Sequence, residues 1–413
     1  MKLGNSRLLT ALRLAFYPAF EPAEAKRFEA LTKQARNARN AGDLAGAEEV
    51  YLRAMTEARR SSDPLQLNFI RHGLAQVYQE QQRFAEAEVL FRDQLEEALK
   101  SPQPTTQLHA AHMALARLYV EQGKHAQAEE HYRAALAETE KPELRPDREL
   151  YTSTALWLAR FYVEQHRHSD AEPLFRRVVE IREADRPSDA SLPHYLQELA
   201  KIYEAQEKYE PAEELYRRAL KISEEQDQPK DFLIVRALSE LAQFYKARER
   251  YVEAEEFSRR SLEIVEEKIK RHSAADISRW QRRPDDKILD ATIKHARVPI
   301  SEALDRLAEI YESQNKYAES EPLRRRSFEI KQQAWSGSGY IWVDSLAAHA
   351  NALHKIGREE EAAKLDEHVE AIRAKYPRSS VRSFITVTST PMKRTLRWRF
   401  NVFINALLHS SPC

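Results

Sequence analysis

The histidines are the residues whose type and spacing come closest to a chemical site. His109 and His112 lie three residues apart, so two imidazoles on one helical face could hold a metal ion between them. No cysteine or carboxylate completes a ligand set beside them, and we interpret the pair as solvated side chains. His166 and His168 fall between two predicted helices and are interpreted as polar loop residues. The histidines therefore predict no metal site.

The sequence lacks the motifs on which most enzymes and cofactor-binding proteins depend. It contains no Gly-rich phosphate loop and no Gly-x-Ser-x-Gly turn, and its eight glycines are too few and too scattered for a dinucleotide-binding fingerprint. The single cysteine is Cys413, which rules out an intrachain disulfide, and no Cys–His nucleophile pair can be assigned. We therefore predict that the protein is not an enzyme and uses no cofactor and no small-molecule substrate.

Paired arginines form the strongest basic signal. They recur in predicted helices as Arg176-Arg177, Arg217-Arg218, Arg259-Arg260 and Arg325-Arg326. A basic stripe of this kind would suit RNA phosphates. However, glutamates stand four residues before the arginines of the middle two pairs, and each Glu–Arg pair at this spacing stabilises a helix by about 0.2–0.5 kcal/mol. We favour ion pairing within the helices and keep an RNA-binding helical repeat protein as an alternative function.

Apolar residues recur three and four positions apart, which predicts the helices that must position these side chains. Within residues 191–228, one stripe contains Leu199, Ala200 and Tyr203, and a second contains Ala212, Leu215, Tyr216, Ala219 and Leu220. A short polar segment separates the stripes, so the two helices must turn back on each other. Small alanines let the two backbones approach closely, and tyrosines fill the space beside them.

The same unit recurs along the chain. A Leu-Ala-x-x-Tyr signature begins at residues 74, 115, 158, 199, 241 and 307. A small residue, which we call the anchor, marks the second helix of each unit at Ala47, Ala87, Ala128, Ala171, Ala212, Ala254, Ser320 and Ala362. Successive anchors are 40, 41, 43, 41, 42, 66 and 42 residues apart. A nearly constant period with one exception indicates a repeat array that carries one insertion.

This pattern resembles the tetratricopeptide repeat, in the longer form of about 42 residues found in kinesin-light-chain-like proteins. The resemblance covers roughly residues 24–375. It implies an all-α, right-handed superhelical solenoid of about eight antiparallel helix pairs that acts as a non-catalytic protein-interaction scaffold or adaptor. Kinesin-light-chain proteins also carry an N-terminal heptad coiled coil, which this sequence lacks, so we do not expect association with a motor.

The periodicity and the proline-rich joints between units divide the chain into three segments. We expect a basic, apolar lead-in at 1–23, the array at 24–375 and a basic tail at 376–413 that could end in a helix. The repeats are expected near 24–60, 66–100, 107–140, 149–184, 191–226, 231–268, 299–335 and 340–375. The insertion covers about 269–298, where we expect the preceding helix to run on before an irregular basic elbow at Arg282-Arg283-Pro284.

Both ends of the chain are basic, although the net charge of the whole chain is zero. Residues 1–20 contain three basic and no acidic residues, and the chain after Glu370 contains eight basic and no acidic residues. No stretch reaches the roughly 18 apolar residues of a membrane-spanning helix. Basic amphipathic ends could instead hold a lipid surface, so a peripheral membrane adaptor is an alternative function. We expect a cytoplasmic location, with membrane association or export through the N-terminal segment as the alternative.

In the proteins that this sequence resembles, the first helices line a concave groove that holds peptides. The groove positions of the third to fifth repeats contain Met113, Arg117, Val120, Leu156, Arg160, Val163 and Lys201. Three cations flanked by four apolar side chains suit a protein partner with an acidic peptide and an apolar anchor. Glu121 and Glu164 stand four residues after the two arginines and could instead pair with them. The Lys and Asn positions of the carboxylate-clamp subset are not matched, so we do not expect binding of chaperone tails.

The seventh repeat departs most from the pattern. Ser320, Arg324 and Ser327 replace an alanine, an aromatic residue and an alanine, so we expect the loosest packing of the array there. Its first helix also places three carboxylates on the groove, at Asp305, Glu309 and Glu312. We therefore expect the groove to change from basic to acidic along its length.

Overall fold

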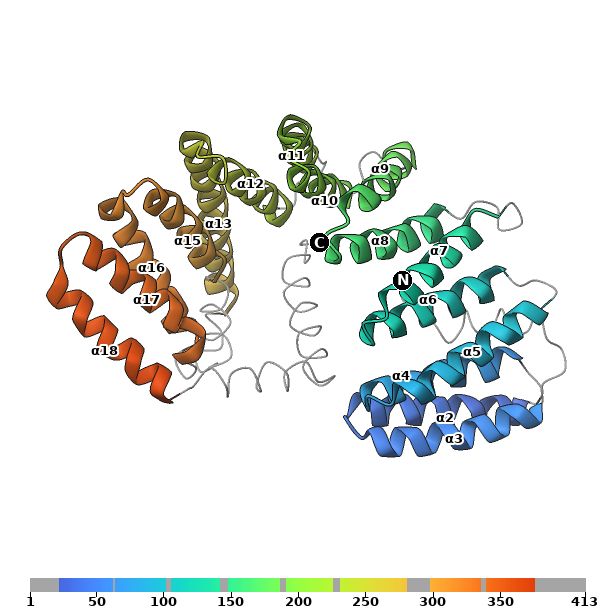
Figure 1. Ribbon diagram of the computed structural model, residues 1–413. Coiled ribbons are helices and arrows are strands. Elements are labelled where there is room, and N and C mark those ends of the chain that lie inside the picture. Colours follow the sequence, from blue (N-terminus) through green and yellow to red (C-terminus); the bar gives the residue numbers. More distant parts are fainter. Residues whose placement is uncertain are drawn as a thin grey trace. The chain divides into compact units, whose positions relative to one another are not determined.

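The part of the chain that the structure describes is helical throughout (Figure 1). The computed structural model describes residues 22–61, 64–101, 105–141, 148–185, 191–225, 231–280, 298–335 and 339–375. In these ranges sixteen α-helices follow one another as eight consecutive pairs. We call the earlier member of each pair its first helix and the later member its second helix. The predicted all-α array of helix pairs is confirmed, whereas the basic tail and most of the lead-in and the insertion lie outside the described residues.

The chain divides into two compact units between Thr154 and Ala155, inside α8 (Arg148–Glu164). The described part of the first unit also contains α2 (Pro22–Asn40), α3 (Leu44–Ser61), α4 (Pro64–Glu80), α5 (Phe84–Lys100), α6 (Thr105–Glu121) and α7 (His125–Thr139). Each helix from α2 to α6 packs against the next one in sequence. The first unit is therefore a simple stack of neighbours, as expected for a repeat array.

The second unit contains the remainder of α8 and the later repeats. Its further helices are α9 (His168–Asp185), α10 (Leu192–Ala205), α11 (Tyr209–Glu224), α12 (Asp231–Lys246), α13 (Tyr251–Trp280), α15 (Val298–Ser313), α16 (Tyr317–Ala334), α17 (Gly339–Lys355) and α18 (Glu359–Lys375). Each packs against the next described helix from α9 to α18. The first helices α10, α12 and α15 also contact one another in turn, so they present a continuous face.

Each helix pair is closed by a turn with one residue in the left-handed conformation. Three turns use a glycine, and the other five use Gln82, His166, Glu207, Glu249 and Asn315. The next backbone N–H in each turn returns to a carbonyl near the end of the first helix, as in the 2.8 Å bond from Lys208 N to Tyr203 O. This bond satisfies a carbonyl that the helix end leaves free. His166 is thus a turn residue, as predicted, whereas His168 is the first residue of α9.

The residues of the repeat pattern are buried within the repeats. All eight anchors have no exposed surface, including Ser320 in the seventh repeat. Four residues after the anchor, the first five repeats bury an aromatic ring, at Tyr51, Phe91, Tyr132, Phe175 and Tyr216. Truncation of a buried ring to alanine destabilises a protein by about 3–5 kcal/mol, so this position is a main contributor to stability. The sixth and seventh repeats depart from it, with Ser258 and Arg324.

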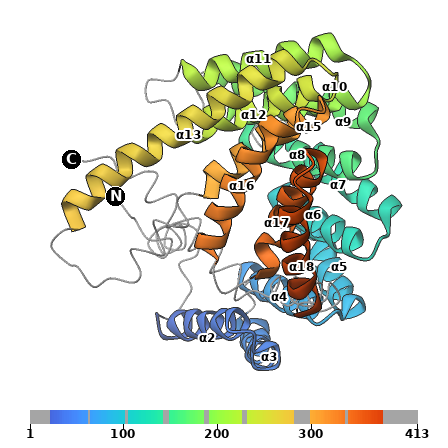
Figure 2. The same ribbon diagram turned by 90° about the vertical axis from the view of Figure 1, so that its left-hand side faces the viewer.

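Helix α13 is the longest described helix. It contains 30 residues, against 16 in α11, and Figure 2 shows it continuing beyond its neighbours in the second unit. The second helix of the sixth repeat therefore runs on into the insertion, as expected, whereas the elbow predicted at residues 282–284 lies outside the described residues. Among the described helices, none combines the length and apolarity needed to cross a lipid bilayer.

Candidate binding face of the first helices

Tyrosines of the signature join each repeat to the one before it. Tyr245 on α12 donates a 2.7 Å hydrogen bond to Glu213 Oε1 on α11, and Arg217 donates to Tyr245 Oη at 2.6 Å. Burial, followed by the bond to Glu213, raises the pKa of Tyr245 to about 12. The same arrangement is formed by Tyr119 with Glu88 and Arg92, and by Tyr311 with Glu255 and Arg259. These side chains hold the repeats together.

The paired arginines of the second helices are held in ion pairs. The first arginine of each pair contacts a glutamate four residues earlier, in Arg176–Glu172, Arg217–Glu213, Arg259–Glu255 and Arg325–Glu321. This contact was predicted for the middle two pairs. The same-helix glutamates predicted for the second arginines of the middle two pairs, Arg218 and Arg260, are wrong. The contacts of the second arginines are Arg177–Glu180, Arg218–Glu183, Arg260–Glu224 and Arg326–Glu266, and the last three reach the second helix of the preceding repeat. An RNA phosphate would have to displace these carboxylates.

His109 and His112 are not the solvated pair that the sequence predicts, because both rings are half-buried and hydrogen-bonded. His109 Nε2 lies 2.7 Å from Thr154 Oγ1, and His112 Nδ1 lies 2.9 Å from Nδ1 of His131 on α7. One Nδ1 must donate and the other must accept, so at least one of these two rings is neutral. Burial accordingly lowers the pKa of both His112 and His131. The described residues contain no group of three or more side chains able to hold a metal ion.

The seven predicted groove residues fall in both compact units. On α6 in the first unit, Met113 and Val120 are half-buried and Arg117 is exposed. On α8 and α10 in the second unit, Leu156 and Val163 are half-buried, whereas Arg160 and Lys201 are exposed. Each unit thus presents the predicted combination of exposed cations and half-buried apolar side chains. That all seven form one row remains a prediction.

The two predicted cations of the second unit differ in their surroundings. Lys201 Nζ lies 2.9 Å from Glu240 on α12 and 3.5 Å from Glu198 on its own helix. Arg160 forms no hydrogen bond or ion pair among the described residues, so the predicted pairing with Glu164 does not form. The N–H donors of Arg160 are therefore available to a ligand, whereas the charge of Lys201 is compensated by Glu240 and Glu198.

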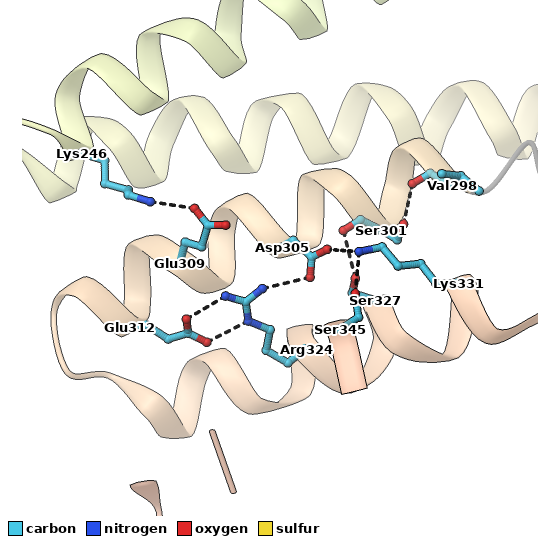
Figure 3. A network of polar contacts seen from close by, with 10 residues as sticks. All are labelled: Lys246, Val298, Ser301, Asp305, Glu309, Glu312, Arg324, Ser327, Lys331 and Ser345. Atoms are coloured by element: carbon cyan, nitrogen blue, oxygen red, sulfur yellow. Dashed lines mark hydrogen bonds and ion pairs between the residues drawn. The ribbon is translucent and has the colours of Figure 1, made fainter. Parts of the chain in front are cut away.

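The carboxylates predicted to make the seventh repeat acidic are all paired (Figure 3). Arg324 binds Glu312 through two nitrogens, at 2.8 and 2.7 Å, and binds Asp305 at 3.1 Å. Asp305 also accepts a 2.5 Å bond from Lys331, and a lysine of α12 binds Glu309 at 2.7 Å. The expected change to an acidic face is therefore wrong, because each of these charges is compensated by a cation.

Polar groups also fill the space that loose packing would leave in this repeat. The Arg324 side chain is only 9% exposed although it replaces a ring. Ser327 Oγ donates a 3.1 Å hydrogen bond to the Ser301 carbonyl, and Lys331 Nζ donates a 2.6 Å bond to Ser345 Oγ. The seventh repeat thus replaces apolar packing with a hydrogen-bonded network, and its lower stability stays a prediction.

Sequence reasoning did not single out Arg236 on α12 and Arg306 on α15. Both are half-buried, and neither forms a hydrogen bond or ion pair among the described residues. Burial lowers the pKa of each guanidinium. Their spacing from Glu240 and Glu309 suggests ordinary helical ion pairs, but these glutamates bind lysines of neighbouring first helices instead. No signal within a single helix could have revealed the two unpaired arginines.

Comparison with protein families matches the helix pairs themselves. Family models described as tetratricopeptide repeat match residues 70–97, 111–146, 151–225 and 234–273. These ranges fall on five consecutive pairs, from α4 and α5 to α12 and α13. No curated protein sequence matches the chain.

Several solved structures resemble the chain at low sequence identity. The apo form of RapI is 14% identical, with a TM-score of 0.53, and the match covers 94% of both chains. BtubC (BKLC) from P. vanneervenii is 21% identical, with a TM-score of 0.42, and covers 59% of this chain and 91% of its own. A putative kinesin light chain from Podosopora anserina is 22% identical, with a TM-score of 0.39, and covers 49% of this chain and 98% of its own. Identities this low inform on the fold alone.

Proposed function

Because the chain is a tetratricopeptide repeat protein, we propose that it is a non-catalytic interaction scaffold whose first helices bind a peptide segment of a partner protein. A preformed array presents its side chains in fixed positions, so the peptide bears most of the ordering entropy. The single cysteine suits a reducing compartment, and we place the protein in the cytoplasm on that ground.

The difference between the cations of the two helix types carries this proposal. All eight paired arginines of α9, α11, α13 and α16 contact carboxylates, and three of these contacts join successive repeats. On the first helices, Arg160, Arg236 and Arg306 form no ion pair among the described residues. Charged donors without an internal partner favour binding of a ligand that supplies acceptors.

The contacts we propose in the second unit centre on α8. Arg160 binds a carboxylate of the peptide, and Leu156 and Val163 receive an apolar side chain next to it. Lys201 contributes less than its exposure suggests, because Glu240 and Glu198 already compensate its charge. In the first unit, Met113, Arg117 and Val120 make the corresponding contacts on α6.

A charge reversal with a matched control tests this function. Peptides selected from a random library displayed on phage are titrated, as fluorescein-labelled synthetic peptides, against the whole chain by fluorescence anisotropy. Arg160→Glu should weaken acidic peptides at least tenfold, or about 1.4 kcal/mol. Lys221→Glu is the control, because Lys221 lies on second helix α11, is 71% exposed and also has a glutamate four residues later. Equal effects of the two substitutions, or no selected binders, would contradict the proposed function.

A further inference from the structure

The sixth repeat lacks the buried ring that precedes it in five repeats. Four residues after the anchor, each of the first five repeats has an aromatic side chain, with Tyr51 in the first and Tyr216 in the fifth. The sixth repeat has Ser258 of α13 at this position. In the fifth repeat the Tyr216 ring lies 5.4 Å from the Phe244 ring of the next first helix. A serine cannot reach as far, so the comparison with the fifth repeat indicates a space between α12, α13 and α15.

A small pocket occupies this space. It is lined by Ala242, Gln243 and Lys246 of α12, Ser258 of α13, and Arg306, Glu309 and Ile310 of α15. Ile310 and Lys246 stand at the positions that correspond to Phe244 and Glu204, which contact Tyr216 in the fifth repeat. The pocket therefore lies at the place that the ring occupies in the fifth repeat, at the first-helix face.

Two hydrogen-bond donors in this pocket have no partner in the described chain. Ser258 is 3% exposed, and its hydroxyl forms no hydrogen bond there. Buried hydroxyls in proteins are almost always hydrogen-bonded, so this one needs an acceptor. The half-buried Arg306 guanidinium is the second donor. Because Lys246 and Glu309 bind each other at 2.7 Å, Arg306 leaves the lining with one excess positive charge.

Three of the four carboxylates that act on the charge of Arg306 are held by other cations, among them Glu309 in its bond with Lys246. Asp305, next in sequence, binds Arg324 and Lys331, as Figure 3 shows. Glu240 on α12 binds Lys201 at 2.9 Å. Glu302, four residues before Arg306 on α15, acts on its charge but forms no hydrogen bond or ion pair with it among the described residues. Arg306 can therefore bind an acceptor from another molecule, and burial makes its charge more costly until one arrives.

We propose that this pocket binds the side-chain carboxylate of a glutamate or aspartate in a peptide partner, with the Arg306 guanidinium and the Ser258 hydroxyl as its donors. A carboxylate accepts hydrogen bonds from both groups and neutralises the excess charge. A carboxylate is also smaller than an aromatic ring, so it fits the small pocket better than an aromatic side chain of a partner would. The inference rests on the proposed function and names the chemistry that one first-helix position selects.

Nuclear magnetic resonance of the whole chain, labelled with ¹⁵N-arginine, tests the pocket directly. The probe is hexaglutamate, acetylated and amide-capped so that every carboxylate is a side chain, and hexaglutamine is the neutral control. Hexaglutamate should shift the Arg306 Nε–H signal, which is identified by its loss in Arg306→Gln, whereas hexaglutamine should not. Equal shifts with both peptides, or an unchanged Arg306 signal at saturation, would overturn the proposal.

Substitutions separate the pocket from the face around it. Ser258→Tyr restores the ring of the other repeats, so it should raise the melting temperature and weaken hexaglutamate at least tenfold. Ser258→Ala keeps the space and removes only the hydroxyl, so a loss of a few-fold is expected even if the tyrosine variant folds poorly. Lys221→Gln on α11 should change nothing. Wild-type affinity in both Ser258→Ala and Arg306→Gln would overturn the proposal.

The two proposals fail in different ways. If library-selected peptides lose affinity in Arg160→Glu but bind Arg306→Gln and Ser258→Ala normally, the pocket assignment is wrong and the scaffold function stands. If no selected peptide depends on Arg160 while hexaglutamate still shifts Arg306, the proposed function at α8 is wrong and the carboxylate pocket stands.

Discussion

The fifth and seventh repeats solve the same packing problem with different chemistry. In the fifth, Tyr216 is 2% exposed and donates a 3.1 Å hydrogen bond to Glu204. In the seventh, the corresponding Arg324 binds Glu312, which corresponds to Glu204, and also binds Asp305. The geometry of one glutamate facing one large side chain is kept, while a neutral ring becomes a cation. The fold therefore requires that this position is filled and that the facing carboxylate is hydrogen-bonded, and tyrosine and arginine meet both requirements.

The energetics of the two solutions differ. A buried ring stabilises through the apolar surface it removes from water, and its hydroxyl adds one hydrogen bond. The free-energy cost of removing a buried cation from water must be offset by its carboxylate partners, so removal of one partner leaves uncompensated charge. The seventh repeat should therefore be more sensitive to loss of a single side chain, although its intact network need not be more stable.

Removal of Arg324 should have the largest effect. Arg324→Ala leaves Asp305 and Glu312 without their shared cation and should destabilise the second unit by about 3–5 kcal/mol. Urea unfolding followed by circular dichroism measures the loss. Arg325→Ala is the matched control, because its side chain is 49% exposed and it should lose about 1 kcal/mol or less. Similar losses in the two variants would show that the network contributes no more than a surface pair.

Conversion of the seventh repeat into the fifth should restore most of that stability. Arg324→Tyr combined with Asp305→Gln reproduces Tyr216 and Gln197, which occupy these positions in the fifth repeat. The double variant should lie within about 1–2 kcal/mol of wild type, because apolar replacement of a buried ion pair is often neutral or stabilising. The same urea titration checks this. A double variant as unstable as Arg324→Ala would mean that the two positions are not equivalent.

Local opening should distinguish the two regions in the intact chain. The stability of an array is roughly a sum of unit terms and neighbour terms, and the seventh repeat has a serine anchor, Ser320, where the others have alanine. We expect α16 to α18 to exchange backbone hydrogens faster than α10 to α12, by about tenfold, or 1.4 kcal/mol. Native-state hydrogen exchange with mass spectrometry resolves the helices. Equal protection of both regions would remove the predicted weak point.

Acid should slightly reduce the stability of the contact between the fifth and sixth repeats, in which Tyr245 of α12 binds Glu213 of α11. Burial alone would raise the pKa of Glu213, but hydrogen bonds from Tyr245, Arg217 and Arg250 lower it overall from 4.5. The unfolded chain then takes up the proton first, so this contribution is present above about pH 4.5 and is lost as the pH falls through the folded pKa.

The substitution Glu213→Gln isolates that contribution. The difference in unfolding free energy between wild type and this variant should shrink between pH 6 and pH 3, by about 1 kcal/mol or less because Glu213 is partly exposed. Urea titrations at each pH measure it. A difference that stays constant over this range would show that the carboxylate charge contributes nothing at the joint.

Most of the fold could be predicted from the sequence, because each repeat is specified by residues close together in the chain. Anchors such as Ala212 and rings such as Tyr216 recur at helical spacing, and the polar turn between the two helices of a unit is too short to allow anything but a helix pair. Each unit packs on its neighbours, so the local pattern also fixes the order of contacts. The same reasoning predicted the ion pairs of Arg217 and Arg259, whose partners are four residues away.

The side-chain pairing that decides the candidate site came only from the tertiary structure. Lys201 is neutralised by Glu240, and Lys246 by Glu309, across distances of 39 and 63 residues along the chain. Helical spacing proposes nearer partners for these carboxylates, among them Arg236 and Arg306, and the choice depends on which side chains reach between adjacent first helices. Charge at a repeat face is a balance between a helix and its neighbours, whereas the helix itself is determined by its own periodicity.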